Sequence, residues 1–298
     1  MRRFLLLSLT FAAWACAQPR PLPEGVRAER DVAFAKTPEK ELLLDLYLPE
    51  EPPDEKLPAV VWVHGGAWRA GSKDNTPAMP LAARDFVVAS VGYRLSQEAL
   101  FPAQIHDVKA AVRWLRANAK RYGVDPDRIG AWGSSAGGHL VGLLGVSGGV
   151  EDLEGDIGDH PDQSSRVQAV VDFFGPSDFL QMDAHSISDR NPHDSSHSPE
   201  SQLVGGPIQQ HPDRVRRVNP ITYVTPDDPP FLIVHGDQDP LVPHHQSVLL
   251  DEALRRAGVP VELVTIEGGG HGRGGLFGSE ELFERVLGFF EHSLADRP

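Results

Sequence analysis

Apolar residues along the chain follow two alternating patterns. Short stretches that are continuously apolar, or apolar at every second position, predict strands, and apolar residues spaced three and four apart predict helices. The predicted strands are residues 26–35, 41–48, 59–63, 86–91, 128–132, 168–174, 230–234 and 261–266. The predicted helices are residues 104–122, 136–145, 248–257 and 280–294. The first two strands are close enough in sequence to form a hairpin.

Strands that alternate with helices predict an α/β fold with a mostly parallel central sheet and helices on both faces. Functional sites in such folds form at the carboxyl ends of the strands. Residues 175–225 interrupt the alternation and are rich in Ser, His, Pro and Asp. Long structureless loops are uncommon inside compact domains. We therefore predict that this segment is an insertion that forms a lid over the site.

Residues 133–137 have the sequence Gly-Ser-Ser-Ala-Gly and lie between a predicted strand and a predicted helix. This is the Gly-x-Ser-x-Gly pattern of a nucleophile elbow, in the strand–turn–helix context that such an elbow requires. The pattern selects Ser135 as the candidate nucleophile. The N-terminus of the helix that follows favours a developing negative charge there. An ordinary Gly/Ser turn is the alternative for this pattern taken alone.

A second glycine-rich segment, His-Gly-Gly-Ala-Trp at 64–68, follows the strand predicted at 59–63. Glycine lets the backbone come close to a reacting carbonyl, and N–H groups placed there stabilise a developing oxyanion. The predicted donors are the N–H groups of Gly66, Ala67 and Ala136. His64 is expected to orient the loop rather than to act as a base. Trp68 and Ser134 are candidates for the wall of the substrate pocket.

A serine nucleophile needs a general base and an acid that orients the base. The strand predicted at 261–266 leads into Gly-Gly-Gly-His-Gly, which makes His271 the candidate base. The strand predicted at 230–234 leads into His-Gly-Asp-Gln-Asp, which offers two candidate acids. Asp239 is preferred, because Asp237 is well placed to accept hydrogen bonds from backbone N–H groups of its own turn.

Taken together, these motifs resemble those of bacterial carboxylesterases of the α/β-hydrolase superfamily. The closest resemblance is to the feruloyl- and acetyl-xylan-esterase-like branch, near the hormone-sensitive-lipase-like esterases. It extends over most of residues 40–290. The segments that carry it are 64–68, 107–114, 125–126, 133–138, 169–178, 235–243 and 270–272. Alanine at position 67, where lipase-like relatives carry a third glycine, favours the feruloyl-esterase-like branch.

The resemblance implies an α/β-hydrolase fold and a serine carboxylesterase that needs no cofactor. The implied substrates are short acyl esters or sugar-linked esters, such as acetyl or feruloyl esters. By the same resemblance, the catalytic triad is Ser135, Asp239 and His271. The implied oxyanion donors are Gly66, Ala67 and Ala136.

The charge balance narrows the possible partners. The 298 residues include 28 Lys and Arg against 42 Asp and Glu, for a net charge of −14. This acidic balance argues against nucleic acid as a partner and against adsorption to anionic lipid. It says nothing about the oligomeric state.

Metal and disulfide chemistry are also disfavoured by the sequence. A single cysteine, Cys16, excludes a disulfide scaffold and a cysteine-based zinc site. The spacing of the His and Asp residues within 185–197 matches no zinc pattern, so no metal site is predicted. Those residues are His185, Asp189, His193, Asp194 and His197.

The first residues have the pattern of an export signal. Two arginines precede an apolar run at 4–14, which is too short to span a bilayer (~20 residues) but suits a signal peptide. Cleavage after Ala17 would release a soluble chain at residue 18. Alternatively, Ala-Trp-Ala-Cys at 13–16 resembles a lipobox, and Cys16 would carry a lipid anchor. A third possibility is an uncleaved cytosolic start. We thus expect a signal peptide at 1–17 and a hydrolase domain at 18–298.

Two rival functions remain open at this level. A peptidase of the prolyl-oligopeptidase type shares the Gly-x-Ser-x-Gly turn, but such enzymes usually carry an additional propeller domain. A non-catalytic binding protein on a hydrolase scaffold is the second rival. Such scaffolds usually lose a triad residue, whereas all three candidates are present here.

Overall fold

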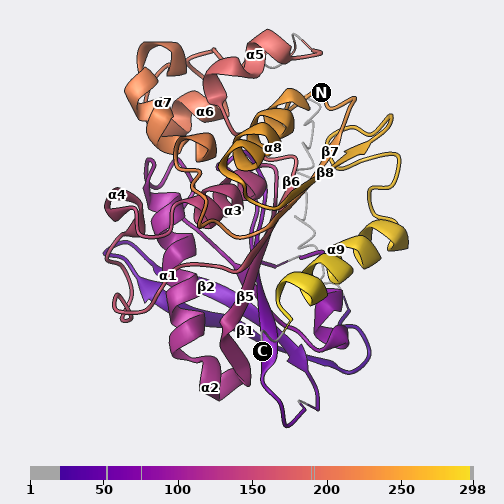
Figure 1. The fold of residues 1–298 in the computed structure, drawn as a ribbon. Helices are drawn as coiled ribbons and strands as arrows, with labels where there is room; N and C mark the ends of the chain where they lie inside the picture. The colour runs from indigo at the N-terminus through magenta and orange to yellow at the C-terminus, as the bar shows by residue number, and fades with distance from the viewer. Residues whose placement is uncertain (1–20, 52, 75, 189, 191, 296–298) are drawn as a thin grey trace, which may run out of the picture.

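Eight strands form one mixed sheet in the order β1-β2-β4-β3-β5-β6-β7-β8 (Figure 1). The computed structural model describes residues 21–51, 53–74, 76–188, 190 and 192–295. β1 pairs antiparallel with β2, and β2 with β4, whereas the remaining neighbours are parallel. The strands are β1 (Val26–Lys36), β2 (Glu41–Pro49), β3 (Leu57–Val63), β4 (Val87–Val91), β5 (Val124–Ser134), β6 (Ala169–Phe173), β7 (Phe231–Gly236) and β8 (Val261–Ile266).

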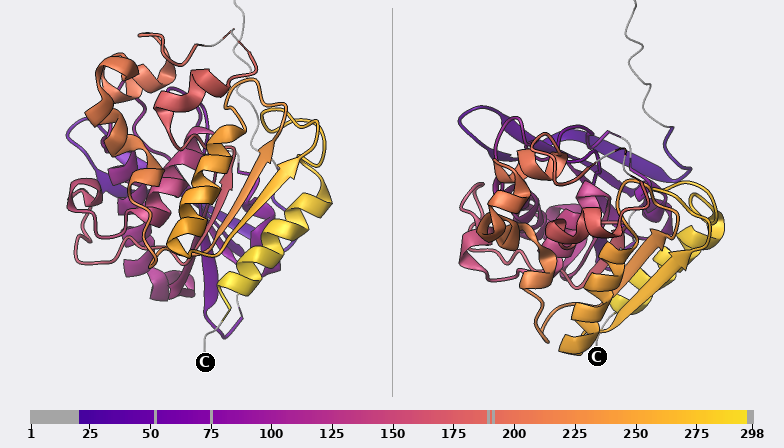
Figure 2. Two further views of the ribbon diagram at one scale, coloured as in Figure 1. Left: turned by 45° about the horizontal axis from the view of Figure 1, so that its top comes forward. Right: turned by 90° about the horizontal axis from the view of Figure 1, so that it is seen from above.

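Helices cover both faces of this sheet (Figures 1 and 2). Alternate residues of one strand belong to different hydrophobic clusters: Val61 packs in the cluster with α1 and α3, and Val60 in the cluster with α9. Burial on both faces explains why the parallel strands are continuously apolar in the sequence. The larger helices are α1 (Ala103–Ala117), α3 (Ala136–Val146), α8 (His245–Ala257) and α9 (Glu280–Ser293).

Two predicted elements differ most from the structure. The helix predicted at 104–122 is broken into α1 and α2 (Ala119–Tyr122), because Asn118 lies between them. The Asn118 side chain donates to the Trp114 carbonyl at 2.9 Å, so it competes with the backbone for that acceptor. The strand predicted at 128–132 is longer at both ends and forms β5.

The segment 175–225 consists of short helices that lie beyond the carboxyl ends of β6, β7 and β8 (Figure 1). Its start and end are joined, because the Asn219 side chain donates to Asp178 at 2.9 Å and accepts from the Phe179 N–H at 3.2 Å. The elements are η2 (Phe179–Gln181), α5 (Met182–His185), α6 (Pro199–Val204), η3 (Ile208–Gln210), α7 (Pro212–Val218) and η4 (Pro220–Thr222). We call this segment the lid.

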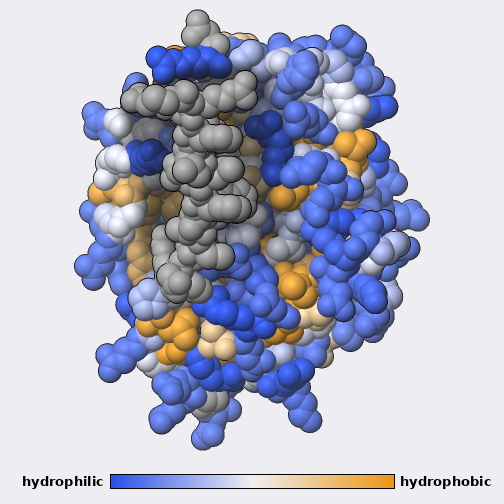
Figure 3. All heavy atoms as spheres, turned by 180° about the vertical axis from the view of Figure 1, so that it is seen from behind, coloured by the Kyte–Doolittle hydropathy of each residue, from blue (hydrophilic) through white to orange (hydrophobic). Residues whose placement is uncertain are grey.

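The short helix η1 (Met79–Arg84) and α9 lie on the same face of the sheet. A single turn of helix, α4 (Glu151–Glu154), follows α3 in the chain. The predicted leader with Cys16 lies outside the described residues. Within the described residues, no helix has the length and hydropathy needed to cross a membrane. The face seen in Figure 3 is mostly hydrophilic, with apolar residues in separate groups.

Candidate active site

Ser135 occupies a sharp turn between β5 and α3. Its backbone lies at φ 56° and ψ −121°, a conformation that L residues rarely adopt. Its N–H donates to the Phe173 carbonyl of the neighbouring strand at 2.8 Å. A Cβ at Gly133 would lie 2.2 Å from the Gly137 carbonyl oxygen, and one at Gly137 would lie 2.0 Å from that of Val63. The two glycines therefore allow the tight contacts that hold Ser135 in this conformation.

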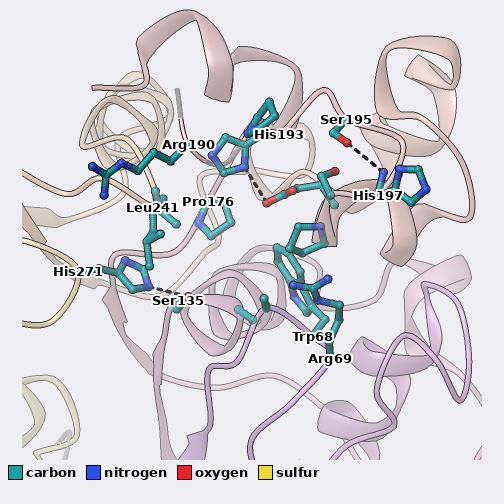
Figure 4. A pocket seen from close by; sticks show the side chains of 17 residues that line it. Trp68, Arg69, Ser135, Pro176, Arg190, His193, Ser195, His197, Leu241 and His271 are labelled. Carbon is teal, nitrogen blue, oxygen red and sulfur yellow. Dashed lines mark hydrogen bonds and ion pairs between the residues drawn. The ribbon is translucent and has the colours of Figure 1, made fainter. Parts of the chain in front are cut away.

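Three of the predicted site residues are joined by hydrogen bonds. His271, in the loop after β8, has Nε2 at 2.9 Å from the Ser135 hydroxyl oxygen. Its other ring nitrogen, Nδ1, lies 2.7 Å from Oδ2 of Asp239, in the loop after β7. Because a carboxylate only accepts, Nδ1 donates to Asp239 and Nε2 accepts from Ser135. Figure 4 shows the pair of His271 and Ser135 at one end of a cavity.

Asp239 is 2% exposed and is surrounded by hydrogen-bond donors. Its Oδ1 accepts from the N–H groups of Leu241 and Val242 at 2.8 and 3.0 Å. Burial raises the pKa of this carboxyl, but hydrogen bonds and charge interactions with His235 and His271 outweigh it, so the pKa is held below its ordinary value. Asp239 is therefore ionised at neutral pH and orients His271.

His235 is a member of this network that the sequence reasoning did not single out. It is fully buried, and its Nε2 lies 2.9 Å from the Val242 carbonyl oxygen and 3.2 Å from Asp239 Oδ2. Both partners only accept, so Nε2 carries the proton, and Nδ1 accepts from the Ser247 hydroxyl at 2.7 Å. The one available sequence signal was its place at the end of β7, just before the two candidate acids.

The loop 64–68 approaches the nucleophile closely. A Cβ at Gly65 would lie 3.2 Å from the Ser135 Cβ. Gly66, Ala67 and Trp68 all have positive φ angles, of 117°, 54° and 55°. Among the predicted oxyanion donors, Ala67 and Ala136 line the cavity at Ser135. Gly66 is exposed and does not line it.

The remaining candidates of this region have structural contacts. His64 is buried, its ring stacks on Tyr93 with centroids 4.3 Å apart, and its Nδ1 contacts the Gly65 carbonyl at 2.8 Å. Trp68 both lines the cavity and packs in the core, where its Nε1 donates to His139 at 3.3 Å. Asp237 accepts from the Gly268 N–H at 2.8 Å, so it joins its loop to the loop after β8 instead of bonding to its own turn as predicted.

The prediction that Ser134 forms part of the pocket wall is wrong. It is the last residue of β5 and is not among the residues that line the cavity. Its hydroxyl oxygen would lie 3.5 Å from a Cβ at Gly65, which places its side chain against the loop 64–68.

The cavity at Ser135 has a volume of about 410 Å³ and lies between the sheet and the lid. Trp68, Pro176 and Leu241 supply apolar parts of its wall, and Figure 4 shows Arg69 beside Trp68 and Arg190 near Leu241. This volume lies at the small end of the range for ligand pockets, which is roughly 300–1,000 Å³. A cavity of this size holds a small molecule rather than a long chain.

The His-rich part of the lid is used in side-chain contacts. His193 bonds to Glu200 at 3.0 Å, and the ring of His185 stacks on that of His245. His197 contacts Ser196, and Asp189 lies outside the described residues. In the described part of the chain, no three or more His, Cys, Asp or Glu side chains are grouped so that they could hold a metal ion.

The parallel sheet, the elbow at Ser135 and the loops that carry Asp239 and His271 define an α/β-hydrolase fold. The chain matches the BD-FAE protein-family model over residues 44–254 and belongs to this family. The expected fold class is thereby confirmed.

Known proteins similar to this chain include several esterases. Esterase LipC from Mycobacterium tuberculosis is 33% identical over 77% of this chain and 56% of its own length. The chain thus spans little more than half of LipC. Carboxylesterase NlhH from the same organism is 32% identical over 82% of this chain and 74% of its own length. A solved structure described as a truncated carbohydrate esterase from gut microbiota is 36% identical, with a TM-score of 0.84 over 93% of this chain and 100% of that one.

The elbow geometry predicts opposite effects for two glycine-to-alanine changes. Gly137→Ala introduces a Cβ 2.0 Å from the Val63 carbonyl oxygen. It should lower the free energy of unfolding by at least ~3 kcal/mol, the upper end of the usual cost of overpacking. Gly288→Ala in α9 is the matched control, because nothing lies within 4 Å of its Cβ position. It should stabilise the fold by ~0.5–1 kcal/mol. Denaturant unfolding measures both values, and equal effects would contradict the steric argument.

Replacing His235 should weaken the Asp239 loop. His235→Phe leaves Asp239 Oδ2 and the Val242 carbonyl without this donor, which should lower the free energy of unfolding at pH 7 by ~1–3 kcal/mol. The pKa of Asp239 is depressed in the fold, so its stabilisation is present above the usual carboxyl range and lost as pH falls. The difference between wild type and variant should therefore persist through the usual carboxyl range and shrink only at lower pH, as pH falls toward the depressed folded pKa of Asp239. Unfolding curves between about pH 1.5 and pH 7 measure it, with His235→Gln, which retains a donor, as the control. A difference that already disappears within the usual carboxyl range, or that is absent at pH 7, would contradict this role.

Proposed function

We propose that this protein is a serine carboxylesterase that hydrolyses carboxylic esters through an acyl-enzyme. The observation that carries the proposal is the hydrogen-bonded series Ser135, His271 and Asp239 at the end of a small cavity. The chain belongs to the BD-FAE family and is similar to named esterases, and both findings support the same activity.

In the proposed reaction, His271 Nε2 takes the proton of Ser135 as its oxygen attacks the ester carbonyl carbon. Asp239 keeps the other ring nitrogen protonated and stabilises the imidazolium that forms. His271 then gives its proton to the departing alcohol oxygen, and the acyl group remains on Ser135. Water, activated by His271, attacks the acyl-enzyme and releases the carboxylic acid.

The developing oxyanion would be stabilised by backbone N–H groups. Ala136 begins α3, where the first N–H groups have no acceptor within the helix and carry a partial positive charge. Ala67 also lines the cavity, and it belongs to the loop whose backbone approaches Ser135 at Gly65. These two are the favoured donors. Gly66 is a third, and it would require movement of the loop because it does not line the cavity in this structure.

Short acyl or sugar-linked esters are the proposed substrates. The cavity of about 410 Å³ has room for a small acyl group and a single ring. The similar solved structure is described as a carbohydrate esterase, which supports an ester of a sugar. A peptidase and a non-catalytic binding protein remain the alternatives to this function. A peptidase would use Ser135 to cleave peptides, and a binding protein would leave Ser135 unreactive.

The catalytic proposal predicts a large and local effect of losing the nucleophile. Ser135→Ala should lower kcat for 4-nitrophenyl acetate by roughly 10⁴-fold or more, with the fold intact by circular dichroism. Ser134→Ala, which removes the neighbouring hydroxyl outside the cavity, is the control and should stay within about threefold of wild type. A fluorophosphonate should label wild type at Ser135. Wild-type turnover by the Ser135 variant, or cleavage of peptides but not esters, would overturn the proposal.

We also propose that the chain is exported, on the sequence pattern of residues 1–17. Expression with its natural start in a bacterial host tests this by the intact mass of the exported product. A chain that begins at residue 18 indicates soluble export, and a chain that begins with a lipid-modified Cys16 indicates a membrane anchor. A full-length product that stays in the cytoplasm would contradict export.

A further inference from the structure

The cavity at Ser135 has a polar wall opposite its apolar end. This wall belongs to the lid, and Figure 4 shows Arg190, His193, Ser195 and His197 on that side. It is formed by Arg190, His193, Ser195, His197, Ser198 and Glu200. A substrate whose reacting carbonyl is at Ser135 would direct another part of itself toward these groups.

Glu200 is the unusual member of this wall. Its side chain is 5% exposed, and its Oε1 accepts from His193 Nδ1 at 3.0 Å, the bond drawn as a dashed line from His193 in Figure 4. The second oxygen, Oε2, is buried and has no hydrogen-bond partner among the described residues. Leaving a buried carboxylate oxygen without a donor costs free energy.

Two other carboxylates of this protein, the buried Asp107 and the half-buried Glu154, have partners for both oxygens. Both oxygens of Asp107 accept hydrogen bonds from Arg94. Glu154 accepts from Lys109, Ser165 and the Gly149 N–H. Among the buried side-chain atoms without a partner in the described part of the chain, Glu200 Oε2 is the one carboxylate oxygen. It also belongs to a residue that lines the cavity at Ser135.

His193 fixes one oxygen of the Glu200 side chain, Oε1, by a hydrogen bond of 3.0 Å. The His193 backbone is fixed, because its N–H donates to Asp183 at 2.7 Å. Burial lowers the pKa of His193, but the hydrogen bond and charge of Glu200, the charge of Asp183 and the Leu241 carbonyl raise it further, so the net shift is upward. With Oε1 occupied by His193, Oε2 is the Glu200 oxygen without a partner, and a carboxylate oxygen only accepts hydrogen bonds. The free oxygen therefore requires a donor.

We propose that Glu200 is a specificity-determining residue that accepts a hydrogen bond from a hydroxyl group on the alcohol part of the ester. The terminal torsion of a glutamate is soft, so a small rotation of the carboxylate presents Oε2 to the cavity that Glu200 lines. Esters of polyhydroxylated rings are then preferred over esters of apolar rings of the same size. This inference rests on the proposed carboxylesterase function.

Two esters with the same acyl group and ring size test this role. One is a mono-O-acetyl methyl xylopyranoside, which keeps free hydroxyls, and the other is cyclohexyl acetate, which has none. Glu200→Gln should lower kcat/KM for the sugar ester roughly tenfold, because a hydrogen bond to a charged acceptor is replaced by a weaker neutral one. The value for cyclohexyl acetate should stay within about twofold of wild type. Glu200→Met, which has no strong acceptor, should show a larger loss on the sugar ester alone.

The controls separate this role from folding and from the function itself. Glu151→Gln removes an exposed carboxylate of α4 that does not line the cavity, and it should change neither ester. Equal losses on both esters in the Glu200 variants, or an unchanged sugar ester, would overturn the role of Glu200 while leaving the carboxylesterase proposal in place. If wild type hydrolyses neither ester and Ser135 is not labelled by a fluorophosphonate, the proposed function itself is wrong, and the role of Glu200 with it.

Discussion

The positive φ angle of Ser135 is the constraint on which the rest of the site depends. The chain passes from β5 to α3 within one residue because Gly133 and Gly137 allow backbone contacts that a Cβ would block. This turn aims the serine side chain away from the sheet and places the start of α3 beside it. Parallel neighbours on the same side of β5 then bring the loops after β7 and β8 to the same edge. The positions of Asp239 and His271 follow from that sheet order.

The site also depends on keeping the buried Asp239 carboxylate charged. Asp239 is buried, and burial alone would favour its neutral form, which cannot orient an imidazole in the same way. Two backbone N–H groups and His235 offset this cost, so the carboxylate stays charged next to His271. His235 is in turn fixed by Ser247 on α8. The helix after β7 thus supports the acid loop that precedes it.

The sequence predicted the parts of this protein that depend on local chemistry. Ser135, Asp239 and His271 follow strands and sit in glycine-rich or aspartate-rich turns, so their placement at one sheet edge could be foreseen from the α/β pattern. The contacts of His235 and Glu200 could not, because they depend on how the irregular loops around these residues fold back on short helices, which periodicity does not describe. The helix break at Asn118 was missed for a related reason, because it involves a side-chain contact that periodicity does not encode. The place of Ser134 outside the cavity depends on packing against the loop 64–68.

The lid is held against the catalytic edge by a small number of contacts. Its two ends are joined through Asp178 and Asn219, and the Ser177 N–H donates to Gln246 of α8 at 2.8 Å. His139 of α3 contacts the Val218 carbonyl of α7 at 2.7 Å, and His193 contacts the Leu241 carbonyl of the acid loop. Lid residues outside these contacts are not part of the hydrogen bonds that hold the elbow and the acid loop. Under the proposed ester hydrolysis, the sheet and its loops position the nucleophile, and the lid wall faces the part of the substrate that does not react.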